Sequence, residues 1–253
     1  NGLRFFVDGK PVPWTRDNVE VYAFYIALPA GAREVTAEIV YTSPVTGSEG
    51  RVVMTDDLMN LQFNQMTLYP AGHYVRQIRV KPSVTMPEGW ATATALDGQT
   101  QAGNVVSFAE TDYQTLVDSP IFAGKHHKSW TIADDVTIEA FAHDPEDLVM
   151  PEGEQEAMSA MMTEANILFG SRPFDHYEFL IALSDELGGI GLEHHRSTEI
   201  TLSPGTFKSW EDGQYPDKYG FSVDVIPHEL VHSWNGKYRR LALTWTPDYR
   251  QPM

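Results

Sequence analysis

The chain has 253 residues, of which 42% are hydrophobic and 11% aromatic, enough to bury one large core or two smaller ones. Asp and Glu outnumber Lys and Arg by 35 to 18, and no basic run forms a phosphate-binding face, so nucleic acid is not an expected partner. The absence of cysteine excludes disulfides and thiolate metal sites, which leaves His, Asp and Glu as ligands for a transition metal.

The sequence carries no sign of a membrane anchor. No stretch approaches the roughly 20 apolar residues of a membrane span, and no signal segment opens the chain. The first residue is Asn1, which lies at the start of a strand-like run, so a removed signal peptide would not be visible. We expect a periplasmic or secreted protein.

The first part of the chain predicts a sandwich-like, all-β domain at residues 1–145. Its hydrophobic and polar residues alternate in short runs that end at clusters of Pro, Gly and Asp, as in antiparallel strands with one buried face. The predicted strands are 19–28, 34–41, 51–54, 74–80, 105–108 and 137–141.

The pattern changes at the second predicted domain, residues 146–253, where helices join the strands, so the chain as a whole is predicted to be α+β. Apolar residues at spacings of three and four predict a helix over 152–169, which Gly170 is placed to end. Two buried strands and a second helix should follow, the helix being capped by Asp224. The later elements are predicted at 177–183, 192–202 and 224–235.

Residues 228–232 read HELVH, which matches the HExxH motif. On a helix, His228 and His232 lie on one face about 6 Å apart, so both imidazoles can bind one tetrahedral zinc ion. Glu229 is placed as the general base that takes a proton from a zinc-bound water. Because a chance match has a probability of roughly 2% in such a chain, we predict a zinc site here.

The third zinc ligand distinguishes the classes of HExxH enzymes. A metzincin requires Gly at position 235 and His at 238, whereas this chain has Asn235 and Tyr238. A gluzincin takes a Glu some twenty residues on, but neither Glu nor His follows His232. Two candidates remain open: Asp248, or a Glu that lies beyond Met253.

A glycine-rich segment, GGIGLEHH at 188–195, is the second informative feature. Glycines that open a strand let another backbone approach closely, as a peptide pairing along an edge strand requires. Glu193 would then face the N-terminus of the substrate. The alternative is a hairpin turn that enters an ordinary strand, with Glu193 solvated and His194 structural.

Five segments carry a resemblance to a known family: LYPAG at 68–72, PEGW at 87–90, LVDSP at 116–120, GLEH at 191–194 and HELVHSWN at 228–235. Together they resemble the glycyl aminopeptidase family of gluzincin metallopeptidases. This resemblance implies an N-terminal β domain, a thermolysin-like catalytic domain and often a C-terminal PDZ domain. It also implies that Gly191, Glu193 and His194 bind substrate, like the GxMEN segment of larger aminopeptidases, although His194 replaces the Asn.

The activity implied by the resemblance is that of a zinc aminopeptidase which releases glycine or alanine from peptides with a free N-terminus. The glutamate ligand, a tyrosine that stabilises the transition state and the rest of the catalytic domain should follow Met253, so this stretch alone is expected to be inactive. Two other hypotheses stay open. One is an endopeptidase on the same scaffold, and the other is a peptide-binding module with a vestigial metal site.

Overall fold

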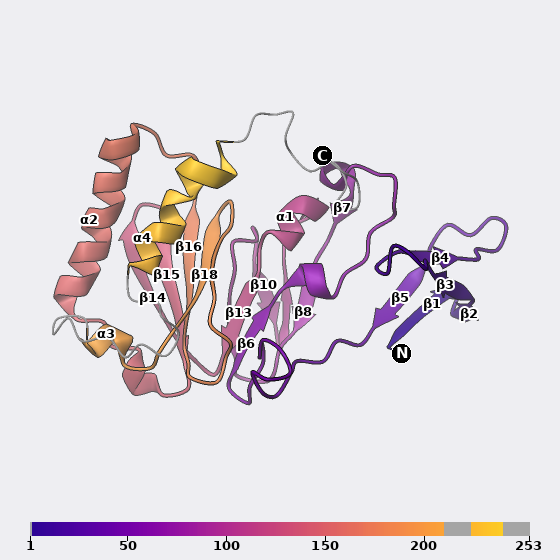
Figure 1. Ribbon diagram of the computed structural model, residues 1–253, viewed down its shortest axis with the longest axis horizontal. Helices are drawn as coiled ribbons and strands as arrows, with labels where there is room; N and C mark the ends of the chain where they lie inside the picture. The colour runs from indigo at the N-terminus through magenta and orange to yellow at the C-terminus, as the bar shows by residue number, and fades with distance from the viewer. Residues whose placement is uncertain (1, 210–223, 240–253) are drawn as a thin grey trace. The chain divides into compact units, whose positions relative to one another are not determined.

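The computed structural model describes residues 2–209 and 224–239 (Figure 1). By its internal contacts the chain separates into two compact units. Unit 1 comprises Asn1–Thr42 and Asn64–Leu68, and unit 2 comprises Ser43–Phe63 and Tyr69–Met253. None of the described helices is long and apolar enough to cross a membrane.

Unit 1 is a small antiparallel β structure. Asp8 and Gly9 both have positive φ, as the two central residues of a type I′ hairpin turn require. Trp14 packs edge to face against Phe5 and Phe24, with ring centroids 6.2 and 5.4 Å away. One sheet has the order β2-β1-β5, from Lys10–Val12, Leu3–Val7 and Thr36–Ile39, and β3 (Trp14–Arg16) pairs with β4 (Phe24–Ile26).

The first half of unit 2 consists of short antiparallel strands and one helix that the sequence did not predict, α1 (Tyr113–Val117). Asp112 caps this helix by accepting a hydrogen bond from the Thr115 backbone N–H. The sheets are β6-β13-β9 (Leu58–Leu61, Ile121–Gly124, Ala91–Ala93), β10-β11-β8 (Thr100–Ala102, Val105–Ser107, Ser83–Thr85) and β12-β7 (Thr111–Asp112, Arg79–Val80).

A five-stranded mixed sheet organises the second half of unit 2. Its three inner strands are parallel, and the strand at each edge runs antiparallel to its neighbour. The single strand predicted over 192–202 is wrong, because the chain turns back at 194–196 to form the β17–β18 hairpin. The order is β14-β15-β16-β18-β17, from His126–Ala133, Val136–Ala142, Tyr177–Leu183, Ser197–Leu202 and Gly191–Glu193.

Helices cover one face of this sheet, and the β6-β13-β9 sheet covers the other. The helix α2 (Glu152–Phe169) has the predicted bounds, and Gly170 ends it in the left-handed conformation at φ 63°. It lies on the same face of the sheet as α4 (Val225–Val231) (Figure 1), and buried residues of both helices belong to one core cluster with residues of β15, β16 and β18. The short helix α3 is Thr206–Ser209.

The predicted boundary at residue 145 lies inside unit 2. Strands β14 and β15 come before it, and β16 and β18 come after it, yet all four belong to one sheet. The sheet that carries the second half of the chain therefore starts at His126.

The second predicted helix, 224–235, is shorter in the structure. After α4 the chain continues in a kinked turn, Ser233–Lys237, in which Asn235 and Gly236 have non-helical backbone angles and the Lys237 N–H donates to the His232 carbonyl at 2.9 Å. Asp224 makes no capping hydrogen bond, because it has helical φ and ψ angles itself.

Candidate active site

The HELVH segment lies on α4 and its C-cap, with its apolar residues turned into the core. Leu230 and Ile226 are fully buried against the sheet, which leaves His228 on the exposed side. The Nε2 atoms of His228 and His232 lie 3.2 Å apart. Two tetrahedral zinc ligands at about 2.05 Å each would be about 3.3 Å apart, so the pair fits one zinc ion.

Trp234, two residues after the second histidine of the motif, contacts the end of α2. Its ring stacks on Phe169 at the end of α2, with centroids 4.6 Å apart, and its Nε1–H donates to the Ser171 carbonyl at 2.8 Å. These contacts fix the turn that follows α4 to the end of α2.

Glu229 is buried, with 5% of its surface exposed. Burial raises the pKa of its carboxyl group; the two imidazoles oppose this effect, and the nearby Glu193 carboxylate adds to it. A carboxylate with a raised pKa is a stronger proton acceptor, which is the property that a general base needs.

Glu193 lies close to Glu229 and His232. Ligand atoms of Glu193, Glu229 and His232 are all within 4.8 Å of one another. The strand that carries Glu193 is held by its pairing with β18. The structure thus brings Glu193 to the face of α4 that carries the histidine pair.

Gly191 is the residue that permits this approach. A Cβ atom at this position would lie 2.8 Å from both Glu229 Oε1 and Val225 Cγ2. In the structure the lack of a side chain at Gly191 makes room for the Glu229 carboxylate and for α4, and the predicted approach of a substrate backbone to this glycine stays a prediction.

Gly191→Ala is expected to lower kcat/KM of the full-length protein at least about tenfold, because the added methyl group displaces the Glu229 carboxylate. It should also cost about 1–3 kcal/mol of stability through overpacking. Gly153→Ala on α2 is the matched control, since a Cβ there meets nothing within 4 Å. Steady-state kinetics and thermal unfolding measure both effects, and a Gly191→Ala enzyme as active as the control would contradict the expectation.

His194 is buried, with 6% exposed, and points away from solvent into a group of carboxylates. Its Nδ1 lies 3.3 Å from Asp118 Oδ1, and its Nε2 lies 3.3 Å from Glu199 Oε1. Burial lowers the pKa of His194, but the two carboxylates outweigh it and raise the pKa to about 9. Both ring nitrogens therefore face protein carboxylates.

Sequence reasoning missed both of these carboxylates. Glu199 is fully buried between the two sheets, where Asn60 Nδ2 and Gln62 Nε2 donate to it at 2.5 and 2.6 Å. Asp118 belongs to the LVDSP segment, which the resemblance singled out without a role. That segment was the only signal in the sequence for this network.

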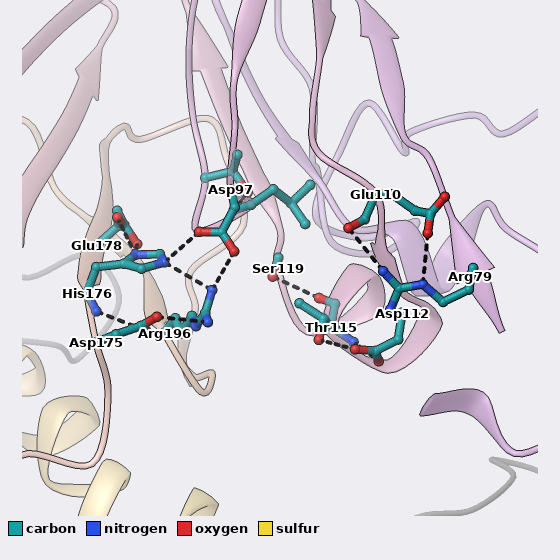
Figure 2. A network of polar contacts seen from close by, with 12 residues as sticks. Arg79, Asp97, Glu110, Asp112, Thr115, Ser119, Asp175, His176, Glu178 and Arg196 are labelled. Carbon is teal, nitrogen blue, oxygen red and sulfur yellow. Dashed lines mark hydrogen bonds and ion pairs between the residues drawn. The ribbon is translucent and has the colours of Figure 1, made fainter. Parts of the chain in front are cut away.

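A second polar network braces the turn of the hairpin (Figure 2). Arg196 donates to Asp97 at 2.8 Å and to Asp175 at 3.0 Å. His176 lies between Asp97 and Glu178, and the hydrogen bond with Glu178 raises the pKa of His176 despite partial burial. Arg196, the last residue of the turn that follows Glu193, is therefore held by both Asp97 and Asp175.

Among the described residues, one group of three side chains could hold a metal ion: Glu193, Glu229 and His232. Asp248, one of the two candidates, lies outside the described residues.

Solved structures share this fold across nearly the whole chain. An aminopeptidase N family protein from Idiomarina loihiensis matches with a TM-score of 0.65 and 17% identity, covering 92% of this chain and 39% of that one. Native leukotriene A4 hydrolase from Saccharomyces cerevisiae has a TM-score of 0.53 at 14% identity, covering 93% and 37%. A two-domain M1 zinc metallopeptidase bound to L-arginine has 0.52 at 15%, covering 92% and 54%.

The fold is thus that of the N-terminal part of M1 aminopeptidases, which confirms the predicted α+β class. The chain spans less than two thirds of each of these proteins. A comparison with curated protein sequences gave no match.

Two family models place the chain more narrowly. The Peptidase M61 N-terminal domain matches residues 1–125, and the M61 glycyl aminopeptidase model matches residues 222–253. Together they take in more than half of the sequence, and the chain belongs to the M61 glycyl aminopeptidase family.

Proposed function

We propose that this chain is part of a zinc-dependent aminopeptidase that removes small residues, glycine or alanine, from peptides with a free N-terminus. The observation that carries the proposal is the convergence of Glu193, Glu229 and His232 within 4.8 Å. Family membership and the M1-like fold support a zinc aminopeptidase in general.

In this proposal His228 and His232 hold the zinc ion, which when bound lowers the pKa of a water molecule and polarises the scissile carbonyl. Glu229 accepts the proton of the attacking water, a role that its burial and raised pKa favour. The remaining ligand is supplied outside the described residues.

Glu193 selects the substrate by its charge. A carboxylate in a partly buried site forms a charge-assisted hydrogen bond with a terminal ammonium, and a peptide with an acylated N-terminus offers no equivalent group. Because Glu193 is half-buried beside the base, the ammonium would lie one residue before the bond to be cut.

Glu193→Gln tests the exopeptidase hypothesis in the full-length protein. We expect kcat/KM for alanyl peptides to fall about 10- to 150-fold, the worth of a charged hydrogen bond, while slow cleavage of the N-acetylated peptides stays unchanged. Glu156→Gln, an exposed residue of α2, is the control. Equal losses on free and acetylated peptides would favour the endopeptidase alternative instead.

The proposal includes the periplasmic or secreted location expected from the sequence. Fractionation of the cells that produce the protein, followed by immunoblotting, tests this part separately from the activity.

A further inference from the structure

The carboxylate of Asp118 collects four donors from two different parts of the chain. Its Oδ2 accepts from the backbone N–H of His195 at 2.8 Å and contacts His195 Nδ1 at 2.5 Å. Its Oδ1 lies 3.3 Å from His194 Nδ1 and 3.1 Å from Lys237 Nζ. The hydrogen bonds to the histidines, together with Lys237, hold the pKa of Asp118 well below its usual range despite burial.

The position of this carboxylate follows from the local sequence. Asp118 is the C-cap of α1, and its N–H donates to the Gln114 carbonyl at 3.1 Å. Ser119 precedes Pro120, and a residue before proline disfavours the helical conformation, so the helix ends here. The Ser119 hydroxyl donates to the Thr115 carbonyl at 2.8 Å, which fixes the turn.

The donors lie on both sides of the proposed active site. His194 and His195 directly follow Glu193, the residue proposed to bind the substrate amine. Lys237 is the last residue of the kinked turn Ser233–Lys237, which follows α4 and His232. The next residue, Tyr238, packs edge-on against the His195 ring with centroids 5.3 Å apart, so the two segments also touch through their rings.

We propose that Asp118 is a positioning residue for amine recognition: by tying the His194–His195 turn to Lys237, it sets the distance between Glu193 and the Glu229–His232 pair. This inference rests on the proposed function. Asp118 lies in the segment matched by the N-terminal family domain, so that domain contributes to substrate selection without touching the substrate.

Asp118 can set this distance because its carboxylate is the shared acceptor for the His194–His195 turn and for Lys237. Without its charge, Lys237 and the His194 imidazole lose a common partner and repel each other across the gap. The hairpin tip is then free to shift relative to α4, and a displacement of about 1 Å at a binding group can cost on the order of 100-fold in rate.

Two single variants and their combination test this in the full-length zinc enzyme. Asp118→Asn keeps an oxygen for His195 but turns an amide N–H₂ toward Lys237, and Lys237→Met removes the second tie alone. We expect Asp118→Asn to lower kcat/KM for alanyl p-nitroanilide about 10- to 100-fold, mainly through a higher KM because the binding of the substrate amine is affected. Lys237→Met should shift KM in the same direction, and the double variant should be no worse than Asp118→Asn, because Lys237 acts through Asp118.

The controls separate this inference from a loss of folding and from the proposed function. Glu110→Gln removes one carboxylate of the same domain, which pairs with Arg79 at the surface (Figure 2). Circular dichroism and zinc content should be unchanged in Lys237→Met, so this variant keeps the test valid if Asp118→Asn fails to fold. The inference is overturned if Lys237→Met behaves like Glu110→Gln, or if free and N-acetylated substrates lose equally. If the wild-type enzyme itself shows no preference for the free amine, the proposed function fails first.

Discussion

Replacing Glu229 with glutamine is expected to lower kcat of the full-length enzyme by on the order of 100-fold or more while zinc remains bound. Glutamine has the size of glutamate and fits the same space against Gly191, but it cannot accept a proton at neutral pH. The histidine pair is unchanged by the substitution, so the metal content should stay at the wild-type level.

Steady-state kinetics and zinc analysis of Glu229→Gln, beside Glu156→Gln as an exposed glutamate control, measure this effect. An enzyme that keeps its turnover would refute Glu229 as the base. Ligand atoms of Glu229 and His232 lie within 4.8 Å of each other. A variant that loses both turnover and zinc would therefore show that Glu229 contributes to metal binding.

The second large effect concerns stability. Glu199→Ala is expected to lower the free energy of unfolding by about 3–5 kcal/mol, the cost of breaking a buried charged pair by removing one partner. The substitution leaves the His194 imidazolium and the side-chain amides of Asn60 and Gln62 without their shared acceptor, between two sheets that exclude water.

Urea denaturation followed by circular dichroism measures this loss. Glu110→Ala is the comparison, because its ion pair with Arg79 is solvent-exposed and such pairs are worth about 0–1 kcal/mol. If Glu199→Ala cost no more than Glu110→Ala, the buried network would not contribute to the stability of the sheet pair.

The elements that the sequence predicted most accurately are those with a strong local signal. The α2 bounds and the strand β16 agree with the prediction, because regular apolar spacing, a terminal Gly170 and a continuous apolar run each determine local structure. Three predicted strands of the first part, 19–28, 34–41 and 105–108, are shorter in the structure, since their ends depend on pairing with distant strands. The predicted strand 137–141 extends over Val136–Ala142, and the prediction for 74–80 is wrong over Val75–Gln77, which form a 3₁₀ helix. The predicted strand 51–54 survives only as a single bridge between Met54 and Met59.

The residues of the site also differ in how far the local sequence could predict their placement. The His228–His232 pair follows from helix geometry alone, because residues four apart lie on one face. The partners of His194 could not be predicted, since Asp118 is 76 residues away along the chain and reaches it only through the fold. The reason for Gly191 was likewise hidden, because its constraint comes from α4, which begins at Val225.

The core between the five-stranded sheet and the β6-β13-β9 sheet limits where this chain can be cut into separate domains. The N-terminal family model ends at residue 125, one residue before β14, but the packing does not stop there. Phe122 meets Phe141 edge to face at 6.5 Å, and both pack in one cluster with Leu180. A protein cut to begin at residue 126 would expose this cluster to water and strip Glu199 of its amide donors. The five-stranded sheet therefore needs the β6-β13-β9 sheet to cover it, and the two have to be expressed as one chain.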